Sequence, residues 1–281
     1  MRGFRDAVGR EVTVRHPPGR VVSLIPSVTE ICFALGAGEQ LVGVTRFCTE
    51  PPGGVAGKAR VGGEKDPDLD RIRELRPDLV IANVEENRKA DVEALAAAGI
   101  PVYVIYPRTV ADGAGLLKTL GELLGAPGAG RALTARVERA LGEVRRLRGG
   151  RAPVRVFCPI WKNPWMACNG DTYVHDVLVT CGGENITADR PARYPRVDLE
   201  EVAAAAPEVI LLPDEPFRFA PKHIPLFHAF PGIPAVRDGR VYCIDGKWIS
   251  WYGPRMAEAL PALTRLILGE SEAPGRRAAA S

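Results

Sequence analysis

One helix-and-strand pattern occurs twice in this chain, in register and without a gap. Residues 68–82 read DLDRIRELRPDLVIA, and residues 198–212 read DLEEVAAAAPEVILL. Each copy starts with an Asp that can cap a helix, because its carboxylate accepts hydrogen bonds from unpaired N–H groups of the first turn. A proline ends the helix, and the apolar run after it is typical of a central parallel strand. The repeat predicts two similar α/β lobes, and ligand sites often lie between domains.

The rest of the chain alternates between strand and helix patterns in both halves. Ser27 is predicted to cap the first helix, with Glu30 three residues later as in a capping box. Asp171 is predicted to cap a helix that runs to about residue 181. The alternation predicts mainly parallel sheets. The expected strands are 21–25, 41–44, 102–105, 154–157 and 240–244, and the other expected helices are 88–98, 110–124 and 254–268.

A long helix is expected between the halves, from about 130 to 148. Its apolar residues recur every three or four positions, which predicts one buried stripe: Leu133, Val137, Leu141, Val144 and Leu147. At about 1.5 Å per residue it would extend nearly 30 Å. We therefore predict an N-terminal lobe over 1–127, a connecting helix within 128–150, a C-terminal lobe over 151–269 and a disordered tail over 270–281.

Composition excludes some classes of function. The net charge of +3 is too small for a chain of 281 residues to indicate binding to nucleic acid or to an anionic membrane. No apolar run approaches the roughly 20 residues that span a bilayer. The first residues, MRGFRD, lack the apolar segment of a secretory signal. We therefore expect a cytoplasmic protein if this sequence is complete, and otherwise one whose leader is missing.

The six cysteines form no C-x-x-C pair and match no zinc-binding spacing. We expect most of them to be small buried hydrophobic residues in a reducing compartment. A disulfide between Cys158 and Cys168 is the alternative.

Motifs for catalysis are missing from the sequence. It contains no Walker A loop, no dinucleotide-binding glycine pattern, no nucleophile elbow and no H-E-x-x-H. The four histidines are far apart in sequence, and His175 is expected to have a structural role. We predict that the chain is not an enzyme and has no metal site or covalently bound cofactor.

Aromatic residues are concentrated in segments that follow strands. All four tryptophans lie in the second half, Tyr194 precedes the second repeat copy, and Phe47 follows a strand of the first half. Loops at the carboxyl ends of parallel strands line the ligand crevice of α/β proteins. The aromatic residues therefore predict a flat-sided site for a large, partly apolar ligand, with ordinary core packing as the alternative.

Several motifs resemble one family over residues 18–268. These motifs are RVVSLIPSVTE at 20–30, PDLVIA at 77–82, CGGENI at 181–186, RVDLE at 196–200 and GPRM at 253–256. In them the chain resembles the substrate-binding proteins of bacterial ABC importers for metal chelates, the group with vitamin B12-binding members.

This resemblance implies two lobes joined by one rigid helix, with the ligand in a cleft between them. It implies that one surface carboxylate per lobe docks onto arginines of the permease, at positions that match Asp70 and Glu200. The alternative for both is an acidic residue favoured by the helix dipole. We expect the chain to act as a monomer.

The resemblance also implies aromatic residues of both lobes around the chelate. Phe47 and Tyr194 match two such positions, whereas Glu64 stands where B12-binding members have a tryptophan, which allows a more polar or cationic ligand. A cysteine at the position of Cys181 is disulfide-bonded in some relatives, but its partner position here is about Thr264. The predicted ligand-binding residues are Phe47, Glu64, Trp161, Trp165, Tyr194, Trp248, Trp251 and Tyr252.

The resulting hypothesis is a binding protein that delivers a corrinoid or related metal chelate to an ABC importer, in the periplasm or at the cell surface. A siderophore or haem binder is one alternative, and haem would need Tyr194 or Tyr252 as its ligand. A cytoplasmic chelate carrier or sensor without a permease is another. A chelatase-like enzyme would need His175 and Glu64 to converge.

Overall fold

The computed structural model describes residues 1–270, and its backbone contacts divide the chain into two compact units. The first lobe comprises Met1–Pro107, Ala111–Arg136 and Tyr252–Pro254. The second lobe comprises, within the described residues, Arg108–Val110, Val137–Trp251 and 255–270. The boundary therefore falls inside the long helix. The tail predicted to be disordered lies, from residue 271, outside the described residues.

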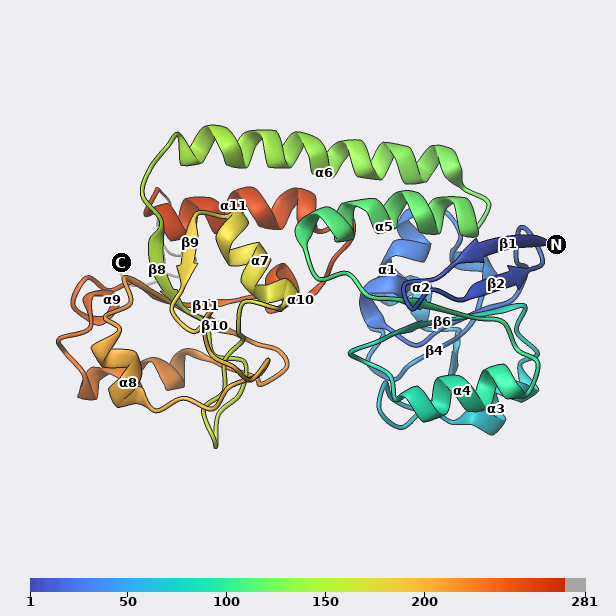
Figure 1. The fold of residues 1–281 in the computed structure, drawn as a ribbon, viewed down its shortest axis with the longest axis horizontal. Coiled ribbons are helices and arrows are strands. Elements are labelled where there is room, and N and C mark those ends of the chain that lie inside the picture. Colours follow the sequence, from blue (N-terminus) through green and yellow to red (C-terminus); the bar gives the residue numbers. More distant parts are fainter. Residues whose placement is uncertain (271–281) are drawn as a thin grey trace. The chain divides into compact units, whose positions relative to one another are not determined.

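The first lobe is built on a five-stranded parallel sheet in the order β5-β4-β3-β6-β7. In Figure 1, α3 and α4 lie on one face of this sheet and α1 and α5 on the other. Strands β1 and β2 pair as an antiparallel hairpin at the N-terminus, and Ala7 in the turn between them donates to the carbonyl of Val104 on β7 (2.9 Å). The elements are β1 Arg2–Arg5, β2 Glu11–Val14, β3 Val21–Ser23, α1 Pro26–Ala34, η1 Gly38–Gln40, β4 Leu41–Val44, α2 Pro52–Val55, β5 Ala59–Arg60, α3 Leu69–Glu74, β6 Leu79–Asn83, α4 Lys89–Ala97, β7 Val102–Ile105 and α5 Val110–Leu123.

The second lobe repeats this arrangement. Its parallel sheet has the order β11-β10-β8-β9, which matches β7-β6-β3-β4 strand for strand and lacks only a counterpart of β5. The predicted pair of similar α/β lobes with parallel sheets is thus confirmed. The elements are α6 Pro127–Arg148, β8 Val154–Phe157, α7 Tyr173–Thr180, β9 Gly183–Asn185, α8 Leu199–Ala204, β10 Val209–Pro213, η2 Pro221–Ala229, α9 Pro234–Arg237, β11 Val241–Ile244, α10 Lys247–Ser250 and α11 Met256–Leu268.

Both repeat copies end their helix in the same backbone conformation. Arg76 and Ala206, the residues before the two prolines, have φ angles of 45° and 47°. A left-handed residue at this place ends a helix, and the proline after it prevents continuation. The capping differs, because Asp68 accepts from the amide of Arg71 (2.9 Å) whereas Asp198 makes no such side-chain bond.

Two other predicted caps are wrong. Helix α1 begins at Pro26 with Ile25 at the capping position, so Ser27 lies inside the first turn. Proline suits the first turn of a helix because the N–H groups there have no partner within the helix, so the missing N–H of proline breaks no hydrogen bond. Helix α7 is capped by Thr172, whose hydroxyl accepts from His175 (3.2 Å), because Asp171 instead pairs with two arginines, Arg108 and Arg193.

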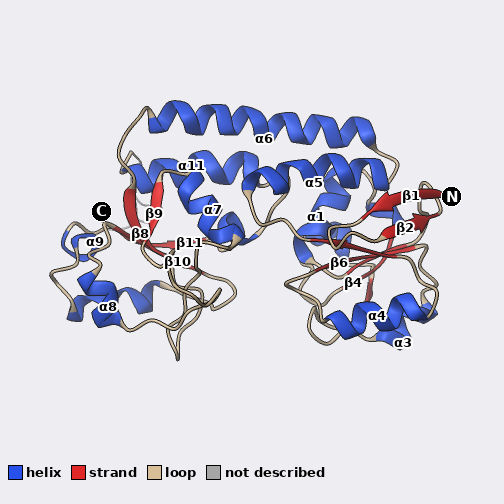
Figure 2. Ribbon diagram, in the orientation of Figure 1, coloured by secondary structure: helices blue, strands red, loops and turns tan. Residues whose placement is uncertain are grey.

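The long connecting helix is confirmed as α6, which starts at Pro127, earlier than predicted. Val137 and Val144 of its apolar stripe are fully or almost fully buried. Figure 2 shows α6 as one continuous helix. No helix of the described residues is long and apolar enough to cross a membrane.

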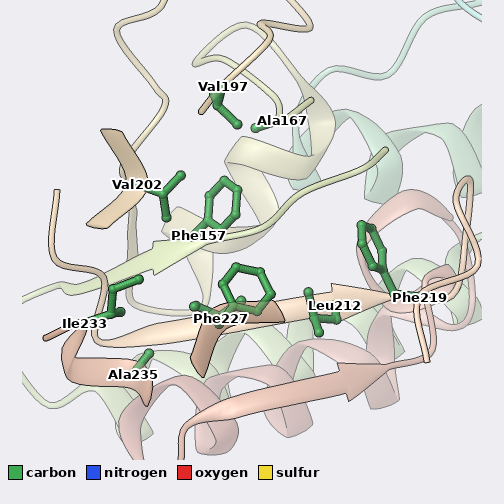
Figure 3. Close-up of a cluster of buried hydrophobic side chains, with 10 residues drawn as sticks. Phe157, Ala167, Val197, Val202, Leu212, Phe219, Phe227, Ile233 and Ala235 are labelled. Carbon is green, nitrogen blue, oxygen red and sulfur yellow. The ribbon is translucent and has the colours of Figure 1, made fainter. Parts of the chain in front are cut away.

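The second lobe has a cluster of buried side chains on one face of its sheet (Figure 3). Phe157 of β8 and Phe227 of η2 are both 0% exposed, and their rings meet edge to face at 6.5 Å. Ile210 and Leu212 of β10 join them because alternate strand residues share a face. This cluster supports the loops that follow β8 and β10.

The six cysteines are free, and five of them are buried, as expected. Cys181 packs against α11, where its thiol lies beside the Thr264 hydroxyl and donates to the carbonyl of Leu260 (3.4 Å). Burial raises the pKa of Cys181 to about 12. The predicted position of Thr264 opposite Cys181 is confirmed.

The left-handed residue of the repeat gives a stability test. A Cβ in this conformation costs roughly 1–2 kcal/mol, so we expect Ala206→Gly to raise the free energy of unfolding by up to about 1 kcal/mol after the added chain entropy is subtracted. Ala204→Gly, two residues earlier and exposed in α8, should lower it by about 0.5–1 kcal/mol. Urea unfolding followed by circular dichroism measures both changes. Equal losses in the two variants would contradict the left-handed conformation.

Candidate functional site

Three aromatic side chains of residues 1–270 are classed as exposed, and all three follow strands. Phe47 is 52% exposed, Trp161 43% and Tyr194 41%. They lie in the loops after β4, β8 and β9, which Figure 2 shows as long irregular segments. Parallel strands place the loops at their carboxyl ends along one edge of a sheet, where α/β proteins bind ligands. Each lobe therefore presents aromatic surface at the edge where a ligand is expected.

Phe47 lies on a tightly held turn of the first lobe. The guanidinium of Arg60 donates to the carbonyls of Thr45 (2.9 Å) and Cys48 (2.8 Å), at the two ends of this turn. The buried Thr29 hydroxyl donates to the Cys48 sulfur (3.1 Å). These bonds hold Thr45 and Cys48 against the body of the lobe, and the side chain of Phe47 between them is exposed to solvent.

Arg46 connects this turn to the next loop. Its guanidinium carbon lies 4.9 Å from the centre of the Phe47 ring, a cation–π distance. The same guanidinium donates to both carboxylate oxygens of Asp66 (2.8 and 3.0 Å). The positive charge beside Phe47 is therefore already paired within the lobe.

Glu64 lies in the loop that contains Asp66. Its carboxylate accepts from the hydroxyl of Thr45 (3.0 Å), and its backbone carbonyl accepts from the amide of Asn87 (3.0 Å). Partial burial raises the pKa of the Glu64 carboxyl, against the opposing effects of its own backbone amide, Thr45 and Arg46. Glu64 is thus a half-buried carboxyl fixed next to the turn of Phe47.

Trp161 projects from a loop that folds back on itself in the second lobe. The backbone of Trp161 pairs with Met166 across the loop. The Trp161 ring rests edge-on against Phe217, at 5.7 Å and 73°. Phe217 comes from the loop after β10, so two strand-end loops together support this exposed indole.

Tyr194 lies on a segment that is hydrogen-bonded to the Trp161 loop. Ala167 donates to the carbonyl of Pro195 (3.0 Å), and Asn169 donates to the carbonyl of Arg193 (3.0 Å). The guanidinium of Arg193 lies 6.0 Å from the Tyr194 ring and pairs with Asp171. The second lobe therefore carries Trp161 and Tyr194 on neighbouring, connected segments.

The other predicted aromatic residues are less accessible. Trp165 stacks on Phe219 (5.8 Å, 12°) and packs against the buried cluster of Figure 3. Trp248 is half-buried in α10. Trp251 is 7% exposed, with Lys247 and Arg255 at 5.5 and 5.3 Å from its ring centre. The structure gives Trp165 and Trp251 clear packing roles within the second lobe.

Tyr252 belongs to the first lobe, where it is 6% exposed. Its hydroxyl accepts from the amide of Asn83 at the end of β6 (2.8 Å), and Ser27 bonds to it as well. Burial raises the pKa of this phenol. Tyr252 therefore fastens the crossing segment Tyr252–Pro254 to the first lobe.

The two acidic residues of the repeat lie on exposed helix starts. The Asp70 carboxylate is 87% exposed and pairs with Arg73 three residues later (2.7 Å). Glu200 is exposed in α8, and no ion pair is recorded for it within residues 1–270. They occupy matching positions, each the second residue of its helix.

The described residues contain no group of three or more His, Cys, Asp and Glu side chains that could hold a metal ion. His175 is half-buried in α7, with Nδ1 3.4 Å from the Asn185 side chain. This contact gives one ring nitrogen of His175 a partner within the second lobe.

Some residues that shape these loops carried no evident signal in the sequence. Thr45, Cys48 and Arg60 hold the Phe47 turn, although none matches a motif. Phe217 was detectable, because Phe217 and Phe219 alternate directly after a strand.

The chain is similar in sequence to two curated vitamin B12-binding proteins. The vitamin B12-binding protein of Vibrio parahaemolyticus is 30% identical over 247 residues, which cover 87% of this chain and 88% of that protein. That of Pectobacterium carotovorum is 29% identical over 263 residues, with 91% and 92% coverage.

Solved structures of periplasmic binding proteins are similar to this chain in fold. The periplasmic vitamin B12 binding protein BtuF of Vibrio cholerae superposes with a TM-score of 0.81 at 25% identity, covering 91% of this chain and 99% of that one. The periplasmic heme-binding protein RhuT from Roseiflexus sp. RS-1 superposes with a TM-score of 0.78 at 27% identity, covering 90% and 99%. The sequence model of the family named periplasmic binding protein matches residues 21–247. The chain therefore belongs to the periplasmic binding protein family.

Proposed function

We propose that this protein binds a corrinoid or a related metal chelate and delivers it to an ABC-type importer. The observation that carries the proposal is the set of exposed aromatic residues, Phe47, Trp161 and Tyr194, on fixed loops at the strand ends. Isolated exposed apolar residues are common, but bulky aromatic rings held on rigid loops at strand ends are typical of ligand sites. Their flat faces suit a large, flat and partly apolar macrocycle.

The proposed ligand contacts are Phe47 and Glu64 in the first lobe and Trp161, Tyr194 and Trp248 in the second. Trp165, Trp251 and Tyr252 act behind them, by holding loops in place, because their rings are already packed within a lobe. The chain matches two proteins named as vitamin B12-binding proteins over most of their length, and these matches support a corrinoid as the ligand.

The proposed role is binding rather than catalysis, and the proposed location is the periplasm or the cell surface. The family name and the names of the relatives support both statements. Asp70 and Glu200 are proposed to dock onto the permease, since each is an exposed carboxylate at the same position of a repeated helix.

Haem is the second candidate, and the accessible phenol of Tyr194 favours it. Tyr252 cannot easily supply this ligand, because its buried hydroxyl is bonded to Asn83. A haem complex would therefore depend on Tyr194, and Tyr194→Phe would weaken hemin binding and shift the Soret band towards that of free hemin.

Binding can be tested by thermal shift with cyanocobalamin, cobinamide, hemin and ferric siderophores. A ligand that binds only the folded state stabilises it by about 2.7 kcal/mol at a hundred times its dissociation constant. We expect the corrinoids to raise the melting temperature most. A complete lack of shift with every compound would contradict the proposed function.

The aromatic contacts can be tested by substitution. We expect Trp161→Ala and Trp248→Ala each to weaken chelate binding by at least about 1 kcal/mol, the usual worth of an aromatic contact beyond its buried area. Val179→Ala, an exposed apolar residue on α7, serves as the control and should leave the affinity unchanged. Isothermal titration gives the dissociation constants, and unchanged affinity in both tryptophan variants would argue against an aromatic site.

Docking makes a separate prediction. Asp70→Arg and Glu200→Arg should each reduce chelate uptake by cells that depend on this protein, while the affinity for the free chelate stays the same. Glu74→Arg and Glu201→Arg are matched controls, since each reverses the charge of an exposed, ion-paired glutamate on the same two helices, away from the proposed docking positions. Equal uptake in all four variants would exclude the docking role.

A further inference from the structure

We propose that Glu64 selects among metal chelates by charge, accepting a hydrogen bond from an N–H donor such as a primary amide of the ligand and excluding a carboxylate at the same place. This inference rests on the proposed function and assigns a specificity to one residue of that site.

The position of Glu64 is fixed from both sides. Its carbonyl accepts from Asn87, whose amide also contacts the carbonyl of Leu24 at the end of β3, and the Asn87 oxygen accepts from the backbone of Asn83 on β6. The adjacent Gly62 pairs with Pro67 across the base of the loop. The carboxyl is therefore presented by a rigid loop, which a specificity residue requires.

The hydroxyl of Thr45 is the one side-chain donor recorded for the Glu64 carboxyl within residues 1–270. A chain of buried groups leads inward from it, because Thr45 contacts the Cys48 sulfur and the Thr29 hydroxyl lies within hydrogen-bond distance of both that sulfur and the Ser23 hydroxyl. These neutral groups orient the carboxyl without neutralising it.

The positively charged side chain that acts on the Glu64 carboxyl, Arg46, is already paired with another carboxylate. Arg46 makes a two-pronged pair with Asp66, so the two side chains together contribute little net charge. Lys65, the neighbour of Glu64 in sequence, donates to the backbone carbonyl of Glu85. A carboxylate that is half-buried and lacks its own cation gains most from new N–H donors and is most sensitive to a second negative charge.

This chemistry separates the candidate ligands. The edge of a corrinoid carries primary amides, each with two N–H donors, whereas haem carries two propionate carboxylates. Two like charges held within a few ångströms of each other repel near a protein surface, where water screens them only in part. Glu64 next to Phe47 thus favours the amide-bearing ring, and a tryptophan at this position could not make the distinction by charge.

The test compares cyanocobalamin with its monocarboxylic acids, in which one amide is hydrolysed and the ring is unchanged. We expect the wild-type protein to bind cyanocobalamin at least about tenfold more tightly than the acid isomer that faces residue 64. In Glu64→Gln this ratio should fall towards one, since the neutral amide removes the repulsion and can donate to the acid. Hemin should bind more tightly to Glu64→Gln than to wild type.

Glu39→Gln is the matched control. It removes the same charge from the same lobe, but Glu39 is exposed in η1, at the amino end of β4 rather than at the carboxyl end. The ratio of the affinities of Glu39→Gln for cyanocobalamin and for the acid isomer should equal the ratio measured for the wild type. The proposal would be overturned if this affinity ratio were the same in the wild type and both variants, or if it changed equally in both variants. Either outcome would leave the proposed binding of a corrinoid intact. Failure of the wild type to bind any corrinoid would overturn the proposed function as well.

The pH dependence adds an independent readout. The groups that face the Glu64 carboxyl are Thr45, Arg46 and Cys48 from the loop after β4 and Asp66 from its own loop. Because burial raises the folded-state pKa of Glu64, its contribution to stability is complete at low pH and is lost as the pH rises through that pKa. We expect the melting temperature of Glu64→Gln to exceed that of the wild type more at about pH 8 than at about pH 4. Discrimination against the acid isomer should weaken over the same range as the pH falls.

Discussion

Parallel hydrogen bonding between β3, β4 and β6, and between β8, β9 and β10, places the carboxyl ends of these strands along one edge of each sheet. Every loop that carries an exposed aromatic residue leaves from such an edge. A parallel strand must return through a helix, so the loop at the carboxyl end is free to vary while the helix and strand keep the fold. The sheets determine where the loops lie, and the loop residues determine what can bind.

The loops hold their shape through polar contacts within each lobe. In the first lobe, one arginine, Arg60, satisfies two carbonyls of the Phe47 turn, and the Cys48 thiol fills the space beneath it. In the second lobe, the segments 161–169 and 193–197 pair through backbone bonds. Rings supported in this way lose little conformational entropy when a ligand binds, which favours affinity.

Much of the fold could be predicted from the sequence, because it follows from periodicity and repetition. The repeat indicated two lobes, and the conserved strand order of the two sheets agrees with it. The errors occurred where tertiary contacts overrode local signals. Ser27 bonds to Tyr252 rather than capping α1, and Asp171 pairs with arginines rather than capping α7. Strand β9, which starts at Gly183, has no apolar pattern because it is a short edge strand.

The candidate site was less predictable, since exposure depends on packing that sequence does not display. Trp161 and Trp165 lie four residues apart in one loop, yet the first is exposed and the second stacks on Phe219. Trp251 and Tyr252 are adjacent but pack into different lobes. Glu64 differs from these residues because its environment is set by a polar chain, Ser23-Thr29-Cys48-Thr45, that starts in the core and ends at its carboxyl. A buried chain of this kind is stable only when each member has a partner, and its last member, at the surface, is the one that can exchange its partner for a ligand. The same hydrogen bonds that stabilise the first lobe therefore fix one half-buried carboxyl at the end of this chain, where we propose that it discriminates among ligands.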